Sequence, residues 1–185
     1  ARRRLCHLRY FALKHIHSRE NAQFKLLLKL AHSSHERKKL GQTILDGVHL
    51  VRAYGETFGP PRALVVSASG VGKAEIAALL QALPAVSVSV FPDAMFNEVA
   101  PVQTPAGVPA VIDTPHEAEL PQQLATCIVV EDVQDPGNLG ALLRSAAAAG
   151  ISDALLSRGC TFAWAPRVVR AGMGAHFALK IYEQV

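Results

Sequence analysis

Hydrophobic positions in residues 18–112 follow two patterns, one typical of amphipathic helices and one typical of short buried strands. Residues 24–31 show helical spacing, and Ser18 or Asn21 before them suits a helix cap. Further helices are predicted over 48–58, 74–83 and 92–99, and strands over 42–46, 63–67, 86–90 and 107–112. This alternation predicts an α/β sandwich over residues 18–112.

A second group of predicted elements follows residues 113–124, which are polar, lack apolar periodicity and are expected to link two domains. Residues 127–130, 154–157 and 177–182 are expected to be strands. Residues 138–149 and 166–171 are expected to be helices, the first closed by Gly150. The predicted organisation is a basic extension over 1–17, a first domain over 18–112, the linker over 113–124 and a second domain over 125–185.

The composition supports an α/β fold and excludes several classes of protein. Half of the 185 residues are hydrophobic and only 6% are aromatic, which suits packed α/β layers rather than a disordered chain. Without an apolar run of 18 residues, no membrane segment is expected. The three cysteines lack metal-ligand spacing, so neither a disulfide framework nor a metal site is expected. Reduced thiols favour a cytoplasmic protein, although the Arg-rich start also permits an organellar transit peptide.

Positive charge is concentrated at the N-terminal end of the chain. The net charge of the whole chain is only +4, but its first forty residues contain two acidic residues, Glu20 and Glu36. The basic residues of this stretch are Arg2, Arg3, Arg4, Arg9, Lys14, Arg19, Lys25, Lys29, Arg37, Lys38 and Lys39. This asymmetry indicates a polyanionic partner, with a solubilising tail as the alternative.

The stretch from Glu131 to Ala146 carries the most informative chemistry, because a polar loop there joins a predicted buried strand to a helix. Ligands of α/β sheets sit at such strand ends. Asn138 is expected to cap the helix, and its buried stripe is expected to be Leu139, Leu142, Leu143 and Ala146. Gly140 lies one turn before Arg144, so we expect a ribose or phosphate to approach closely there. The alternatives are a surface salt bridge for Arg144 and a simple cap for Asn138.

These residues resemble a known family. Asn138-Leu139-Gly140 followed by Arg144-Ser145-Ala146 is similar to the first signature motif of the SpoU branch of the SPOUT methyltransferases. The similarity continues through Ser157-Arg158-Gly159-Cys160 and from Pro166 to His176. Ser18 to Lys25, Arg37-Lys38 and Leu45 to Leu50 resemble the family's L30e-like substrate-binding domain, with Asp46 where a glutamate is usual. The expected fold is therefore an L30e-like α/β sandwich followed by part of a SPOUT domain, which is knotted and Rossmann-like.

The resemblance implies transfer of a methyl group from S-adenosyl-L-methionine to a ribose 2'-hydroxyl in rRNA or tRNA. It casts Arg144 and Asn138 as catalytic. Since a guanidinium keeps its proton, Arg144 is expected to orient the hydroxyl and stabilise negative charge. The residues expected to bind RNA, through phosphates, are Arg19, Asn21, Lys25, Arg37 and Lys38. A homodimer is expected, with no membrane or metal partner.

The family's two further motifs are expected beyond residue 185. In the family they supply the trefoil knot and most of the cofactor pocket, so no cofactor-binding residue is assigned and these 185 residues are expected to be inactive alone. The alternative function is a noncatalytic RNA-binding module.

Three other features are weaker candidates for chemistry. The segment Ser69 to Lys73 lacks the residues of a phosphate-binding loop and is interpreted as a strand-to-helix turn. His176 is expected to be a structural histidine. Phe162 and Trp164 can either stack on a base or pack in the core.

Overall fold

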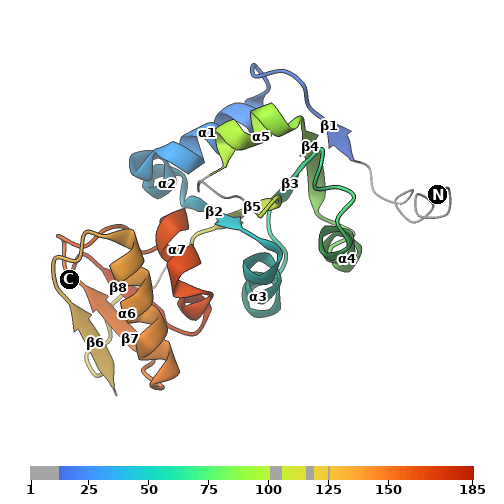
Figure 1. The fold of residues 1–185 in the computed structure, drawn as a ribbon. Helices are drawn as coiled ribbons and strands as arrows, with labels where there is room; N and C mark the ends of the chain where they lie inside the picture. Colours follow the sequence, from blue (N-terminus) through green and yellow to red (C-terminus); the bar gives the residue numbers. More distant parts are fainter. Residues whose placement is uncertain (1–12, 101–105, 116–118, 125) are drawn as a thin grey trace.

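The computed structural model describes residues 13–100, 106–115, 119–124 and 126–185, which form two β-sheets with flanking helices (Figure 1). The predictions for Arg2, Arg3, Arg4, Arg9 and Cys6 lie outside the described residues. No helix in the described ranges is long and apolar enough to cross a membrane. In the same ranges, no three His, Cys, Asp or Glu side chains gather as metal ligands.

The first sheet is mixed and has the strand order β1-β4-β3-β5-β2. Its strands are β1 (Lys14–His15), β2 (Gln42–Asp46), β3 (Ala63–Ser67), β4 (Ser87–Phe91) and β5 (Pro109–Asp113). β5 runs antiparallel to both β2 and β3, whereas β1, β4 and β3 are parallel. The short strand β1 lies within residues 1–17, where the sequence predicted a basic extension and no strand. Two residues carry too little pattern to indicate a strand, and only the pairing with β4 creates it.

Helices cover both faces of this sheet (Figure 1). α1 (Ala22–His32) and α5 (Asp93–Val99) lie on one face, and α3 (Val48–Phe58) and α4 (Ala74–Ala82) lie on the other. Adjacent strand residues divide between the two faces: Ile44 packs in the α1–α5 core and Leu45 in the opposite core. The sheet is therefore buried on both sides, as the short apolar runs predicted.

One helix was missed by the sequence pattern. α2 (Ser34–Leu40) follows α1 directly, and Ser33 serves both helices. Its backbone N–H donates to Lys29, which closes α1, and its hydroxyl accepts from the N–H of Glu36, which starts α2. Leu40 is 41% exposed, so α2 has no apolar stripe and appears in the sequence only as a charged cluster.

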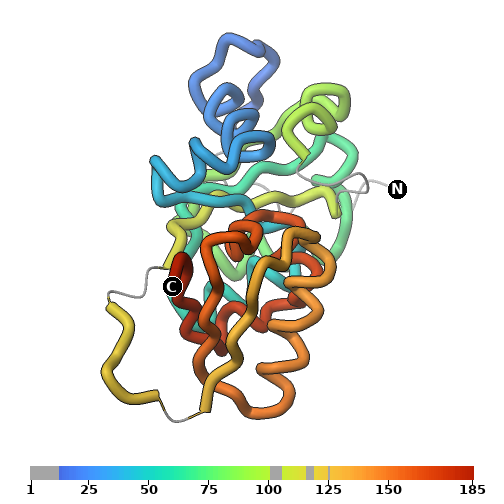
Figure 2. The backbone as a smooth tube through the Cα atoms, turned by 90° about the vertical axis from the view of Figure 1, so that its left-hand side faces the viewer, coloured from blue at the N-terminus to red at the C-terminus, as the bar shows by residue number. Residues whose placement is uncertain are grey.

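The second sheet is parallel, in the order β6 (Cys127–Val130), β7 (Asp153–Leu156) and β8 (Lys180–Glu183). The helices α6 (Pro136–Ala148) and α7 (Pro166–Gly172) pack against each other beside it (Figure 2). A 3-10 turn, η2 (Ala175–Phe177), precedes β8, so the predicted strand over 177–182 began too early. The apolar residues of 177–182 reach the core partly from this turn and partly from β8.

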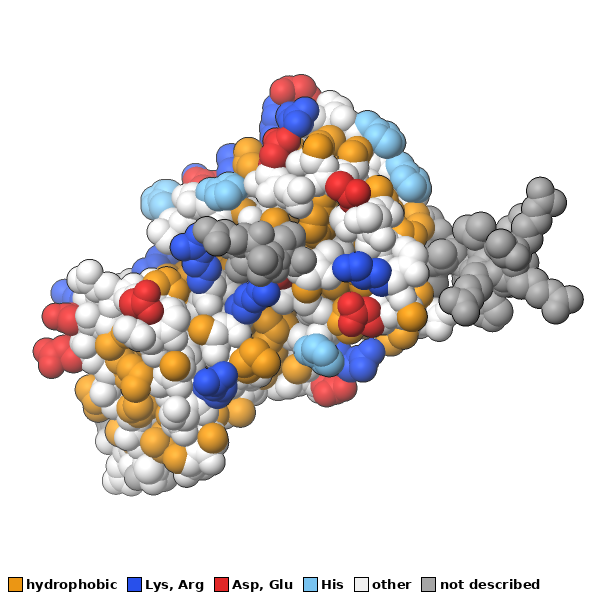
Figure 3. Space-filling model, in the orientation of Figure 1, with side chains coloured by type: hydrophobic (Ala, Val, Ile, Leu, Met, Phe, Trp, Pro, Cys, Tyr) orange, Lys and Arg blue, Asp and Glu red, His pale blue; other side chains and the backbone are white. Residues whose placement is uncertain are grey.

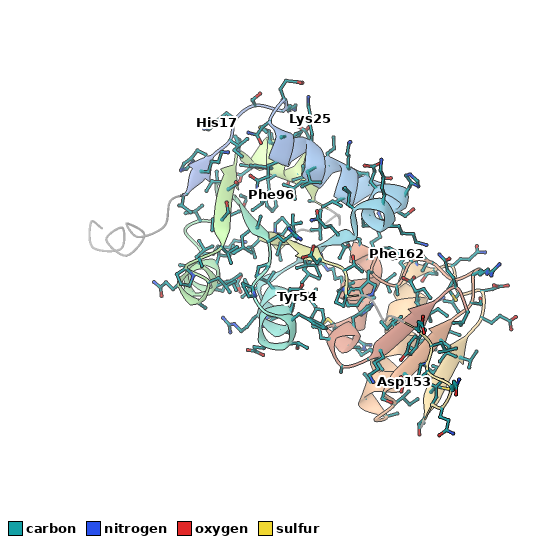
Figure 4. The ribbon with its side chains drawn as sticks, turned by 180° about the vertical axis from the view of Figure 1, so that it is seen from behind. His17, Lys25, Tyr54, Phe96, Asp153 and Phe162 are labelled. Atoms are coloured by element: carbon teal, nitrogen blue, oxygen red, sulfur yellow. The ribbon has the colours of Figure 1, made fainter. Side chains whose placement is uncertain are left out.

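The two sheets are joined by a continuous core. Leu45, Leu64 and Ile112 from the first sheet share a cluster with Leu139 on α6 and Val168 on α7, the helices beside the second sheet. The Thr43 hydroxyl donates to the Trp164 carbonyl at 2.7 Å. Figure 4 labels Phe162 at this junction. Phe162 and Trp164 are 9% and 4% exposed, so they pack in the core rather than present a surface for stacking on a base.

His176 is buried completely, as its structural interpretation anticipated. Its Nε2 lies 2.9 Å from the Ala163 carbonyl, and its ring packs edge-on against Trp164. Nδ1 has no hydrogen-bond partner among the described residues. Burial lowers the pKa of the imidazole to about 4, and the Ala163 carbonyl opposes this shift only partly.

This histidine should make the fold acid-sensitive. Its pKa is lower when folded than the ordinary 6.5, so the unfolded chain binds the proton more readily and stability falls as pH drops from 6.5 towards 4. We expect His176 to remove about 2 kcal/mol of unfolding free energy between pH 7 and pH 5. Urea unfolding of the parent and of His176→Gln at both pH values tests this. The fall in unfolding free energy from pH 7 to pH 5 should be smaller in His176→Gln by about that amount. Equal differences would contradict the assignment.

Candidate functional site

The loop after β6 is held by the loop after β7. The N–H of Asp132 donates to the Ser157 hydroxyl at 3.0 Å, and that hydroxyl donates to Asp132 Oδ1 at 3.1 Å. Thr161 N–H donates to the Val133 carbonyl at 2.9 Å. A Cβ on Gly159 would lie 1.9 Å from Asp132 Oδ1, so only glycine permits this approach. The carboxyl ends of two parallel strands thus support one polar loop, the usual position of a ligand site in α/β proteins.

Helix α6 begins two residues earlier than predicted, and Asp135 rather than Asn138 is its cap. The Asn138 N–H donates to Asp135 Oδ1 at 2.8 Å, and Pro136 occupies the first turn, where its missing N–H costs nothing. From the sequence only Asn138 was expected as the cap, but Pro136 is favoured at the first helical position, which places the cap at Asp135. Since Asn138 does not cap, its exposed amide side chain remains available to a ligand.

A shallow hollow of about 560 Å³ lies beside the start of α6. Its lining residues are Asp132, Val133, Gln134, Asp135, Asn138, Ala141, Leu142 and Ser145. Leu142, predicted to be buried, is 39% exposed on this side, whereas Gly140 is buried instead. Arg144 is exposed but does not line the hollow among the described residues. The structure therefore places both predicted catalytic residues on α6 without bringing them to one hollow.

Gly140 has a packing role, which corrects the prediction that it opens space for a ribose or phosphate. A Cβ there would lie 2.5 Å from the Ala171 Cβ, 2.6 Å from the Val168 carbonyl oxygen and 2.8 Å from the Gly172 nitrogen. The missing side chain thus allows α7 to approach α6 backbone to backbone. The sequence could not show this, because the partner helix lies 26 or more residues away.

An ion pair joins α7 to the first sheet. Arg170 NH1 donates to Asp46 Oδ2 at 2.8 Å, and the Ala106 N–H lies 3.2 Å from Oδ1 and 3.3 Å from Oδ2. The Asp46 side chain is 1% exposed and that of Arg170 is 39% exposed. Burial raises the pKa of Asp46, and the Ala106 N–H and the Arg170 charge offset only part of that rise. This pair, which the sequence did not reveal, fixes α7 and thereby α6.

The residues predicted to bind RNA fall into two groups. Arg19, Asn21 and Lys25 lie around the start of α1, where Arg19 pairs with Glu98, Lys25 pairs with Glu20 at 2.5 Å and Asn21 caps the helix. Figure 4 labels Lys25 at the end of the molecule far from Phe162. Arg37 and Lys38 lie on α2, at the junction of the two sheets.

These two α2 residues differ in exposure. Lys38 is exposed, with its Nζ 5.1 Å from the centre of the Phe162 ring. Arg37 is 7% exposed, and its NH1 donates to the Leu30 carbonyl at 2.6 Å and to the Ala31 carbonyl at 3.3 Å. Of the two groups predicted to bind RNA, only the pair on α2 lies near the second sheet and its helices, which we call the second unit.

The structure is an α/β protein with a polar loop at the carboxyl edge of a parallel sheet. Beside this loop, helix α6 presents the Asn138 amide and the Arg144 guanidinium to solvent. The sequence profile of the SpoU rRNA Methylase family matches residues 125–185, which contain this loop and both helices. This match confirms, for residues 125–185, the resemblance to the SpoU methyltransferases seen in the sequence.

Individual relatives agree with this result. The chain is 34% identical over 156 residues to rRNA methyltransferase 3, mitochondrial, of Mus musculus, a match that covers 80% of the chain and 37% of that protein. It is 29% identical over 172 residues to 23S rRNA (guanosine(2553)-2'-O)-methyltransferase of Bacillus subtilis, covering 91% of the chain and 64% of that protein. The chain spans only about a third of the length of the vertebrate relatives for which the matched region is longest.

Solved structures share the arrangement of both sheets. The AdoMet-bound rRNA methyltransferase from Sinorhizobium meliloti superposes with a TM-score of 0.74 at 25% identity, covering 93% of the chain and 65% of that structure. A putative RNA methyltransferase of the TrmH family from Porphyromonas gingivalis gives a TM-score of 0.71 at 30% identity, covering 87% of the chain and 61% of that structure. These matches confirm the α/β fold.

Proposed function

We propose that the protein containing these residues methylates a ribose 2'-hydroxyl of structured RNA with S-adenosyl-L-methionine as the donor. The observation that carries the proposal is helix α6, which is anchored at its buried face by Gly140 and presents Asn138 and Arg144 to solvent within the SpoU-matched segment. The rRNA methyltransferase names of the curated relatives support RNA as the substrate class, with rRNA ahead of tRNA.

In this proposal Arg144 acts on the acceptor hydroxyl as an electrostatic and orienting group. Its side chain is exposed and has no hydrogen bond or ion pair within the described ranges, so no acidic neighbour neutralises it. A guanidinium donates hydrogen bonds but keeps its proton, so it stabilises an oxyanion without acting as a base. Asn138 faces the adjoining hollow and would hold the loop and nearby RNA.

S-adenosyl-L-methionine would supply the methyl group, and an AdoMet-bound structure lies among the matches of the fold. The hollow beside α6 offers two carboxylates, two amides and a hydroxyl but no enclosing apolar slot for a sulfonium and an adenine. We therefore assign no cofactor contact to residues 1–185 and propose that these residues alone do not catalyse the transfer.

The remaining predictions form part of the same proposal. Residues 18–112 would be an L30e-like RNA-binding domain, residues 113–124 a linker and residues 125–185 part of the SPOUT domain. Arg19, Asn21, Lys25, Arg37 and Lys38 would contact phosphates, and the full-length protein would be a homodimer. A cytoplasmic location stays a prediction, because the relatives include mitochondrial as well as bacterial proteins.

Methyl transfer to RNA by the full-length protein tests the proposal. We expect Arg144→Ala to lower the rate by about a hundredfold, since one lost oxyanion donor typically costs that much. Arg52→Ala is the matched control, because Arg52 is an exposed arginine on α3, distant in sequence from the SpoU segment. Labelled S-adenosyl-L-methionine and ribosomal RNA provide the assay. Binding of RNA with no methylation would replace this function with a noncatalytic RNA-binding module.

A further inference from the structure

Arg37 is a buried cation that no described acidic residue neutralises. Its side chain is 7% exposed, yet no carboxylate among the residues that the structure describes lies within ion-pair distance. Its NH1 is satisfied by two carbonyls of α1, but Nε is buried and has no hydrogen-bond partner within the described residues. Burying a charge without a counter-ion is costly, so an anion bound beside Arg37 would stabilise the folded chain.

Arg37 borders a groove between the two units of the fold. The groove has a volume of about 560 Å³. One wall is formed by the α1–α2 junction and the end of α5, and the other by the first residues of α6 and α7. Its cationic or titratable lining side chains are Arg37, Arg167 and His32, and its described lining includes no Asp or Glu. In Figure 3, Lys and Arg side chains lie on both sides of the junction between the two units. A phosphate entering this groove would meet positive charge from both walls.

Arg167 and His32 provide the accessible part of this lining. Arg167 is exposed in the first turn of α7 and forms no hydrogen bond or ion pair in the described part of the chain. His32 is exposed at the end of α1, with its Nε2 3.0 Å from the Glu98 carbonyl. By contrast, the hollow beside Asn138 is bordered by Asp132 and Asp135, which repel an anion.

We propose that this groove binds a backbone phosphate of the substrate RNA, with Arg37 at its buried end and Arg167 opposite. Guanidinium groups recognise phosphate through paired, charge-assisted hydrogen bonds, which suits an arginine on each unit. Pro136 lines the same groove two residues before Asn138, so a phosphate there places RNA next to the start of α6. The inference rests on the proposed function and extends it, because it assigns to Arg167 and to the junction itself a role in positioning the RNA.

Arg167 carries the test, because Arg37 also holds the end of α1 through its carbonyl contacts. We expect Arg167→Gln in the full-length protein to weaken binding of a ribosomal RNA hairpin about fivefold at 0.1 M salt. The slope of log K against log salt should fall by about 0.8, as expected for one lost phosphate contact. Arg52→Gln, the same charge change on the other face of the first sheet, should leave both quantities unchanged. Arg37→Lys, which keeps the charge but loses the planar fork, should also weaken RNA binding while the melting temperature reports whether it folds.

The outcomes separate this site from the proposed function. An Arg167→Gln protein with unchanged affinity and salt slope would overturn the phosphate site, even if the parent protein methylates RNA. If Arg167→Gln lowers both the RNA affinity and the salt slope, but the parent protein never methylates RNA, the phosphate site is supported and the proposed methyltransferase function is refuted. If inorganic phosphate protects the parent protein thermally but neither arginine variant changes RNA binding, the groove binds free phosphate and the RNA assignment is wrong.

Discussion

Replacing Gly140 with alanine is expected to destabilise the folded chain by about 3 kcal/mol, the upper part of the usual range for overpacking. The added Cβ would fall within 3 Å of the Ala171 Cβ, the Val168 carbonyl oxygen and the Gly172 nitrogen. Two of these are backbone atoms, so no change of rotamer relieves the contact and α6 must move away from α7. Since α6 carries Asn138 and Arg144, methylation should fall together with stability.

The matched control is Gly55→Ala on α3, where a Cβ would meet nothing within 4 Å. Alanine in a helix interior is more favourable than glycine by about 0.5–1 kcal/mol, so this variant should be slightly stabilised. Urea unfolding measures both changes. Equal stability of the two variants would show that α6 and α7 are not in close backbone contact.

Removing the guanidinium of Arg170 with Arg170→Met is expected to cost about 3 kcal/mol at pH 7, as is typical when one partner of a buried pair is lost. The Asp46 carboxylate would remain buried, with the Ala106 N–H as its one donor among the described residues. The same change at exposed Arg52, Arg52→Met, should alter the unfolding free energy by less than about 0.5 kcal/mol.

The pH dependence of this loss follows from Asp46. Because burial raises its pKa, the stability linked to Asp46 is greatest below its ordinary pKa and declines as pH rises through the folded value. Without Arg170 the pKa of Asp46 in the folded chain should rise further. The difference in unfolding free energy between Arg170→Met and the parent should therefore shrink from pH 7 to pH 5. Asp46→Asn should recover at least half of the loss in the double variant, because it removes the buried charge. A loss that does not change with pH, or that Asp46→Asn fails to recover, would contradict the account.

Local pattern predicted most of the elements because each one carries its own signal. The strands β2, β3 and β6 and the helix α3 begin and end where the short apolar runs and helical spacing placed them. Elements without an apolar pattern were missed: β1 exists only through its pairing with β4, and α2 through its Ser33 cap. Local sequence does not contain these tertiary partners.

The sequence placed the candidate residues on their helix but did not give the geometry around them. The motif located Asn138 and Arg144 on the correct helix, but Asp135 takes the cap and Gly140 serves helix packing. Arg170 stood within the recognised motif without a role, since its partner Asp46 lies 124 residues away. The burial of Arg37 could not be read from a run of charged residues, where every side chain is expected to be solvated.

The central claim is that the acceptor is a ribose 2'-hydroxyl. The most direct measurement is nucleoside mass spectrometry of ribosomal RNA after reaction with the full-length protein and S-adenosyl-L-methionine, with the Arg144→Ala protein alongside. We expect a 2'-O-methylated nucleoside with the parent protein and its near absence with the Arg144→Ala protein. A methyl group found on a base, or on ribose to the same extent with Arg144→Ala, would contradict it.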